Sequence, residues 1–160
     1  MEGDQALVFE QLKKASENKY RDIKSLFCPA LGRAVVFNAD GFHHLRYYNS
    51  RSERPKRVQV NKLTCFKNVP DVLSKTTTIQ EYRRTICPTG KADRSGYRAV
   101  SVVEWFGFIA IINLEKKIRI KIVVRRIGQQ DGKYHFWSVM PYWRLNSGIR
   151  ITGAADLEDD

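Results

Sequence analysis

The chain has 160 residues, of which 42% are hydrophobic and 28% are charged, so it can bury the core of one domain and is not an intrinsically disordered protein. Basic residues outnumber acidic residues by 28 to 17. Residues 1–25 hold five of each sign and residues 156–160 hold four acids, which leaves residues 26–155 with 23 basic and 8 acidic residues, a net charge of +15. The longest uncharged apolar run, residues 105–114, is far too short to span a bilayer, and we expect no membrane association.

The first third of the chain predicts a helix followed by a buried strand. Apolar residues recur at helical spacing and Pro29 ends the pattern, so we expect an amphipathic helix over residues 1–28. Residues 33–38 form a short apolar run typical of a buried strand. After the Asp40-Gly41 interruption, residues 42–45 are predicted as a helical turn.

The middle of the chain predicts loops and short helices. The polar and basic residues 49–57 contain a proline and predict an exposed loop, which a helical stretch follows. Residues 78–81 have the form of a capping box, so we expect a short helix from Thr78 through Arg84. Residues 88–96 predict another loop.

The last third predicts β-strands, because it is rich in Val, Ile and aromatic residues. The predicted strands are residues 99–105, 108–113, 118–125 and 133–140, with Gly107 as a bulge or a bend and a hairpin loop over residues 128–132. The fold class is therefore α+β, with N-terminal helices packed on an antiparallel sheet, a meander of three to five strands. We divide the chain into the helix 1–28, a single basic core domain 29–150 and an acidic, flexible tail 151–160.

The basic core predicts a polyanionic partner, of which nucleic acid is the simplest; the alternative is a soluble basic surface without a partner. Cys28, Cys65 and Cys87 form an odd set without Cys-x-x-Cys spacing. The acidic N-terminus leads into no apolar signal core. Together these features predict a cytoplasmic protein without disulfides.

Sequence motifs of several enzyme classes are absent: a phosphate-binding loop, a dinucleotide fingerprint, a zinc-hydrolase helix and a nucleophile elbow. Acidic residues in the core occur singly, and Asp93, Glu104 and Glu115 would have to be assembled for a two-metal nuclease. We therefore expect neither a metal nor another cofactor.

Three histidines and many arginines remain as groups for chemistry. In metal-independent RNA cleavage a general base removes the 2′-hydroxyl proton, a general acid protonates the leaving 5′ oxygen, and cations stabilise the phosphorane. Histidine suits both proton transfers because it titrates near neutrality. His43 and His44 follow the first predicted strand and His135 lies on the last, and which of the first two belongs to a site stays open. Each could instead be a buried, hydrogen-bonded residue.

Alternation along the last two strands predicts a basic face. One side of the last strand is expected to hold His135, Trp137 and Val139, and the other side Phe136, Ser138 and Met140. One side of the preceding strand is expected to hold Arg119, Lys121 and Arg125. If the histidine and the cations share a face, the sheet offers a base, an aromatic platform and phosphate-binding charges to single-stranded RNA; otherwise Trp137 is a packing residue.

Two further groups of cations have alternative roles. Arg125 and Arg126 are adjacent and cannot face the same way, so one serves a site or surface and the other a salt bridge. The loop cations are either phosphate contacts or solvated charge: Arg54, Lys56 and Arg57.

Four stretches carry a family resemblance: residues 35–45, which include Gly-Phe-His-His-Leu, residues 81–84, residues 122–128 and the His-Phe-Trp-Ser-Val-Met of residues 135–140. They resemble small phage- or mobile-element-associated bacterial proteins of the barnase/EndoU/colicin/RelE-like ribonuclease superfamily. The resemblance implies N-terminal helices on an antiparallel sheet of about four strands and a metal-independent ribonuclease, often a toxin. Position by position, it implies His44 as the histidine after the first strand, Arg125 or Arg126 as a central-strand cation and Ser138 as the hydroxyl of the last strand.

The leading hypothesis is therefore a small cytoplasmic metal-independent endoribonuclease of the toxin or mobile-element effector type. Its expected catalytic residues are His44, His135, Arg125, Arg126 and Ser138. Its expected substrate-binding residues are Lys121, Arg119, Arg54, Lys56, Arg57 and Trp137. The alternatives are a non-catalytic RNA- or DNA-binding module and a protein-interaction subunit with a basic surface. The expected partners are RNA and a cognate inhibitor protein.

Overall fold

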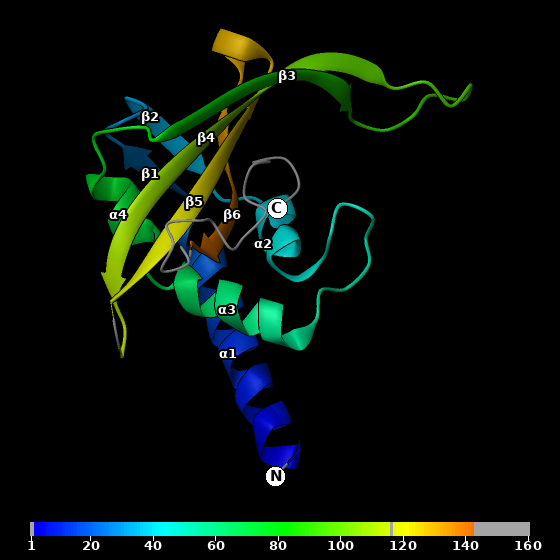
Figure 1. The fold of residues 1–160 in the computed structure, drawn as a ribbon. Helices are drawn as coiled ribbons and strands as arrows, with labels where there is room; N and C mark the ends of the chain where they lie inside the picture. The colour runs from blue at the N-terminus through cyan, green and yellow to red at the C-terminus, as the bar shows by residue number, and fades with distance from the viewer. Residues whose placement is uncertain (1, 116, 143–160) are drawn as a thin grey trace, which may run out of the picture.

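A computed structural model describes residues 2–115 and 117–142 (Figure 1). Its elements in chain order are α1 (Glu2–Ile23), β1 (Ser25–Cys28), β2 (Arg33–Val36), α2 (Ala39–Arg46), α3 (Lys56–Phe66), α4 (Val69–Lys75), β3 (Glu81–Thr89), β4 (Ala99–Asn113), β5 (Lys117–Ile127), a short 3₁₀ turn (Gln129–Asp131) and β6 (Tyr134–Pro141). The strands form one sheet in the order β1-β2-β6-β5-β4-β3. The α+β class is confirmed, but the described sheet is mixed and has six strands, where the sequence predicted an antiparallel meander of three to five.

Two further expectations concern the ends of the chain and membranes. The boundary expected at residue 150 and the tail 151–160 lie outside the described residues. Across the described ranges, none of the helices is both long enough and apolar enough to cross a membrane.

The first helix is shorter than predicted. It ends at Ile23, and Lys24 adopts a left-handed backbone conformation with a φ of 56°. Residues 25–28 then form β1, which pairs antiparallel with β2. The predicted helix over residues 1–28 is therefore wrong at its C-terminal end, because pairing with β2 outweighs the helical spacing of Leu26.

A parallel ladder joins the first part of the chain to the last strand. β2 pairs with β6 through Val35–Tyr134 and Val36–His135. Beyond this short ladder, helices α2 and α3 pack against β6. The segment that follows β2, with both of its histidines, is thereby brought beside the last strand.

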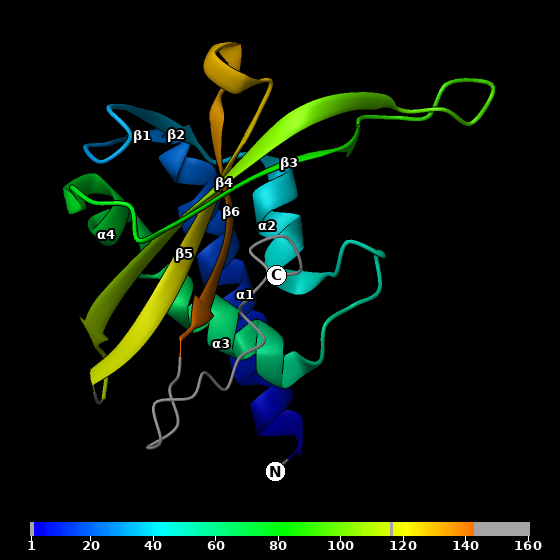
Figure 2. The ribbon, with the colours of Figure 1, turned by 45° about the horizontal axis from the view of Figure 1, so that its top comes forward.

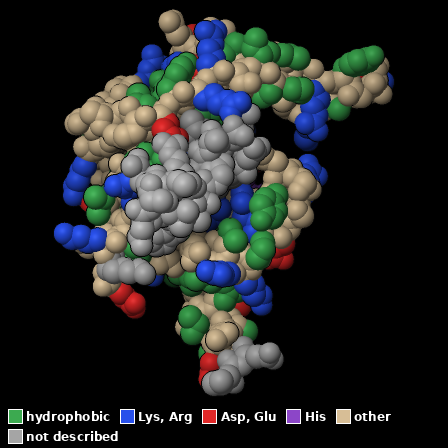
Figure 3. Space-filling model, in the orientation of Figure 1, with side chains coloured by type: hydrophobic (Ala, Val, Ile, Leu, Met, Phe, Trp, Pro, Cys, Tyr) green, Lys and Arg blue, Asp and Glu red, His purple; other side chains and the backbone are tan. Residues whose placement is uncertain are grey.

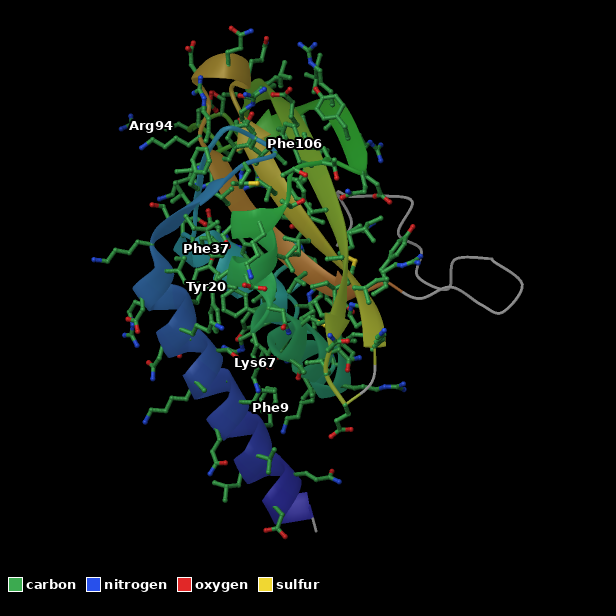
Figure 4. All side chains as sticks on the ribbon, turned by 90° about the vertical axis from the view of Figure 1, so that its left-hand side faces the viewer. Phe9, Tyr20, Phe37, Lys67, Arg94 and Phe106 are labelled. Carbon is green, nitrogen blue, oxygen red and sulfur yellow. The ribbon has the colours of Figure 1, made fainter. Side chains whose placement is uncertain are left out.

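The main hydrophobic core lies between the sheet and the helices. Tyr20 of α1 is its centre, with ring centroids 5.3–5.9 Å from those of Phe37, Phe66 and Phe136. Its hydroxyl donates to the backbone oxygen of Asn38 at 2.7 Å, and burial raises its pKa. Figure 4 shows Tyr20 and Phe37 between α1 and the sheet.

The capping-box prediction over residues 78–84 is wrong. Residues 81–89 form β3, which pairs with β4 from Glu81–Gly107 to Thr89–Ala99. The side chains of β3 are exposed at alternate positions, as expected of an edge strand with one open face. The predicted helical middle corresponds to α3 and α4, and the predicted loop 49–57 ends at Pro55, because α3 begins at Lys56.

β4 is one continuous strand in the structure. Its register with β5 runs unbroken through Gly107, so of the two predicted alternatives the bulge is wrong. β4 pairs with β5 only as far as Val103, and beyond that point β3 and β4 continue as a two-stranded ribbon that projects from the body (Figure 2).

The bulge lies in β6. Val123 pairs with Ser138 and Val124 pairs with Phe136, so Trp137 is the extra residue. Beyond this extra residue, the side chains of β6 point to the face opposite the one that simple alternation predicts. Met140 therefore joins Trp137 in a second apolar cluster. This cluster consists of Val103, Trp105, Val123, Trp137 and Met140, on the sheet face opposite the main core. Ser138, Val139 and Met140 therefore point to the opposite faces of the sheet from those that the sequence predicted.

Candidate active site

Arg125 and His135 are direct partners across the β5–β6 ladder, so both point to the face of the second cluster. The guanidinium carbon of Arg125 lies 3.7 Å from the ring centroid of Trp137 and 5.6 Å from that of Trp105. Both Arg125 and His135 are half-buried. The predicted sharing of one face by the histidine, Arg125 and Trp137 is therefore seen in the structure.

Three buried N–H groups of this face have no hydrogen-bond partner within the described part of the chain. They are Arg125 Nε, Trp105 Nε1 and Trp137 Nε1. Buried donors are almost always paired in native proteins, so a group of unpaired donors around one cation calls for an acceptor. Donors of this kind beside a guanidinium suit an anion such as a phosphate.

His135 is held by the residue that caps α2. The Oδ1 atom of Asn38 accepts from the Gly41 N–H at 3.2 Å, which fixes the amide so that Nδ2 lies 3.2 Å from His135 Nδ1. Since an amide nitrogen only donates, Nδ1 is the acceptor and the neutral ring carries its proton on Nε2. Burial lowers the pKa of His135 and the charge of Arg125 adds to this, while Asp40 opposes both. Burial and the charge of Arg125 therefore both favour the neutral form of the ring.

His44 lies on the other side of Trp137. Its ring stacks on the indole with centroids 4.3 Å apart, and only 3% of the residue is exposed. Two groups as close to the ring centre as His44 and Arg125 cannot share one face of it, so the indole separates them. Nη2 of Arg54 lies 3.2 Å from His44 Nε2, and because arginine only donates, this nitrogen accepts. His43 stacks on Tyr47 instead.

Arg126 points to the opposite face of the sheet, as its alternation with Arg125 predicts. It forms a salt bridge with Glu104 at 2.7 Å and donates from Nη1 to the Tyr134 hydroxyl at 2.9 Å. The structure therefore brings Arg125, and not Arg126, next to His135.

The expected hydroxyl on the last strand is buried and occupied. Ser138 accepts a hydrogen bond from Lys62 Nζ at 2.9 Å, and Lys62 also donates to the backbone oxygen of Val139 at 3.3 Å. Ser138 is fully buried and Lys62 is 2% exposed. Nothing in the sequence distinguishes Lys62 from the other lysines, whereas Asn38 could have been found as a helix cap before an Asp-Gly pair.

The expected substrate-binding cations are spread over several places. Lys121 is 1% exposed and lies 3.2 Å from Glu81, and Arg119 is half-buried farther along β5. Arg54 is 4% exposed and holds the loop after α2, because its Nε donates to the backbone oxygens of His44 and Tyr47.

The two remaining loop cations belong to a separate region. Lys56 and Arg57 begin α3 and line a cleft of about 480 Å³ between α1 and α3, together with Gln5, Ala6, Phe9 and Val60. Phe9 faces α3 in Figure 4, and Lys56 Nζ lies 5.6 Å from the centre of its ring. None of the residues around Arg125 lines this cleft.

Over residues 2–115 and 117–142, no group of three or more His, Cys, Asp or Glu side chains is arranged to hold a metal ion. Comparison of the chain with protein-family models, with curated proteins and with solved structures gave no match.

Proposed function

We propose that this chain is a metal-independent endoribonuclease that binds the phosphodiester of RNA at Arg125. The observation that carries the proposal is the group of unpaired buried donors around Arg125, next to a histidine whose pKa is lowered by burial and by Arg125. Arg125 and His135 are both partly exposed, which supports their direct contact with a phosphate. The net charge of +11 supports a polyanionic substrate.

In the proposed reaction the 2′-hydroxyl of RNA attacks the adjacent phosphorus. The hydroxyl displaces the amide of Asn38 from His135 Nδ1, and this nitrogen takes the proton as the new bond forms. The bond from phosphorus to the 5′ oxygen breaks, and the protonated ring returns its proton to that oxygen. Arg125 stabilises the negative charge on the phosphorane oxygens. The products are a 2′,3′-cyclic phosphate and a 5′-hydroxyl.

The roles of the other candidates follow from their positions. His44 supports Trp137 from the side away from Arg125, so we assign it to positioning. Both faces of the Trp137 indole are covered, by His44 and by Arg125, so this ring offers no platform to a base. Ser138 of β6 and Lys62 of α3 form a buried pair.

The experiment incubates the purified protein with an end-labelled 20-nucleotide RNA in excess EDTA. We expect cleavage that leaves cyclic phosphate ends, with a loss of about 10²–10⁴-fold in His135→Ala and about 10²–10³-fold in Arg125→Gln. The matched control is Arg33→Gln, which removes an exposed arginine from β2. Thermal melts verify that each variant is folded.

Two outcomes would contradict the proposal. Intact RNA that still shifts on a gel would identify a non-catalytic binding module. Wild-type rates in folded His135→Ala would remove His135 from the chemistry.

A further inference from the structure

The projecting part of the β3–β4 hairpin is a basic arm. Residues 86–102, which lie beyond the last pair of β4 with β5, carry three basic residues, Lys91, Arg94 and Arg98, and one acidic residue, Asp93. Lys91, Arg94 and Arg98 are exposed, and in the described residues no acidic side chain pairs with them. We call residues 86–102 the arm.

The single acidic residue of the arm is used to shape its tip. The Asp93 carboxylate accepts from the backbone N–H groups of Ser95 at 2.8 Å and Tyr97 at 3.0 Å. The Asp93 N–H in turn donates to the Tyr97 oxygen at 2.7 Å. These bonds close the tip as an ordered turn that displays Arg94 and Arg98, so the arm presents a defined set of cations.

The two faces of the arm differ. One face is apolar and exposed, with Ile86 71% and Val100 63% exposed. The opposite face carries small polar groups, and the hydroxyl of Thr89 donates to that of Ser101 at 2.9 Å. Cys87 lies on this second face and packs against the cluster of Trp105 and Trp137. The polar face of the arm is therefore continuous with the surface around Arg125.

Figure 3 agrees with this division: hydrophobic side chains gather on the upper side of the arm, and Lys and Arg side chains lie below it.

The arm is long enough to follow several nucleotides. Six residues of β4 separate Trp105, which lies beside Arg125, from Ala99 at the base of the tip. At about 3.3 Å per residue this distance is about 20 Å, the length of about six stacked nucleotides at about 3.4 Å each.

We propose that the arm is an RNA clamp, which binds the sugar–phosphate backbone of the substrate on one side of the bond that Arg125 and His135 contact. The hydroxyls of its polar face lie along the strand, and the tip cations bind phosphates about six nucleotides away. The inference rests on the proposed function for its starting point, the phosphate at Arg125. It adds a substrate class: an RNA strand that continues well beyond the reacting linkage.

The test measures binding of 2′-O-methyl RNA, which lacks the attacking hydroxyl, at lengths of 4, 8, 12 and 20 nucleotides. The tip variant Lys91→Gln/Arg94→Gln/Arg98→Gln is compared with the control Lys14→Gln/Arg33→Gln/Lys117→Gln, which removes three exposed charges from α1, β2 and β5. We expect the wild-type affinity to rise steeply with length, and the tip variant to bind the 20-nucleotide RNA at least tenfold more weakly. The slope of log K against log salt should fall by about 2 in the tip variant, since each lost phosphate contact contributes about 0.7.

The outcomes separate the clamp from the ribonuclease. The clamp would be overturned if the tip and control variants lose the same amount of affinity for RNA. It would also be overturned if the affinity of the tip variant rises with RNA length as steeply as that of the wild type. Either result holds even if the protein cleaves RNA. A selective loss in the tip variant would support the clamp even if the cleavage assay finds no product, in which case the ribonuclease proposal alone fails.

Discussion

Arg125 and His135 face each other across β5 and β6, and after burial the guanidinium is the main cause of the lowered pKa of the imidazole. This pairing is unfavourable for a protonated histidine, but it suits a group that must accept a proton at pH 7. The same guanidinium lies over Trp137, which holds it against the sheet.

We expect the His135 ring to titrate below its ordinary pKa of about 6.5. The Arg125→Gln variant should raise its midpoint, because a positive neighbour is lost. As the pH falls below about 6.5, the unfolded chain takes up this proton first, so the free energy of unfolding should decrease toward acid. NMR titration of the ring and urea unfolding of wild type against His135→Gln check both parts. A midpoint at or above 6.5 in the wild type would refute the argument.

The buried Lys62–Ser138 pair predicts an asymmetric double-mutant cycle. Ser138→Ala removes an acceptor from a buried ammonium and should lower the free energy of unfolding by about 1–3 kcal/mol. Adding Lys62→Met removes the charge as well and should restore part of this loss. Urea unfolding of the four proteins measures the coupling, and additive losses would show that the two side chains do not stabilise each other.

Gly41 of α2 packs tightly against β6. A Cβ atom built at Gly41 would lie 2.5 Å from the backbone oxygen of Phe136, which cannot move without breaking the sheet. Gly41→Ala should therefore cost about 1–3 kcal/mol of stability and displace Asn38 from His135. The control is Gly3→Ala in α1, where nothing lies within 4 Å and the helix should gain up to about 1 kcal/mol. Similar melting temperatures for the two variants would disprove the close contact.

The thiols should differ in reactivity. Burial raises the pKa of Cys65 to about 11, and burial also raises that of Cys28, so neither forms a thiolate near pH 8. Cys87 on β3 is the more exposed thiol. A colorimetric disulfide reagent should therefore titrate one thiol in the native protein and three in denaturant, and Cys87→Ser should abolish the native reaction. Rapid reaction of a second thiol would contradict the buried core around Cys28 and Cys65.

Local patterns predicted the elements that local forces decide. The helical spacing of α1 and the alternation of β5 are visible in the sequence because each element buries one regular face. The strand β1 could not be predicted, since Leu26 fits the helical spacing and only β2 makes a strand of it. For the same reason the Thr78 capping box was misleading, because β4 imposes strand geometry from Glu81 onward.

The candidate site was predicted in its residue types better than in its arrangement. Alternation correctly placed Arg125, His135 and Trp137 on one face. It could not predict the bulge at Trp137, which inverts the strand beyond it. The separation of His44 from Arg125 by an indole depends on how α2 packs on β6, and no spacing in the sequence encodes it.

The parallel ladder between β2 and β6 has a consequence for biosynthesis. Asn38 is made early and His135 late, and β2 has no partner on its β6 side until Tyr134 has been synthesised. A nascent chain that ends before that point has the basic arm but lacks the strand that carries His135 and Trp137. If the chain is a ribonuclease, its nascent chain therefore has no working site until β6 has been synthesised and has paired with β2.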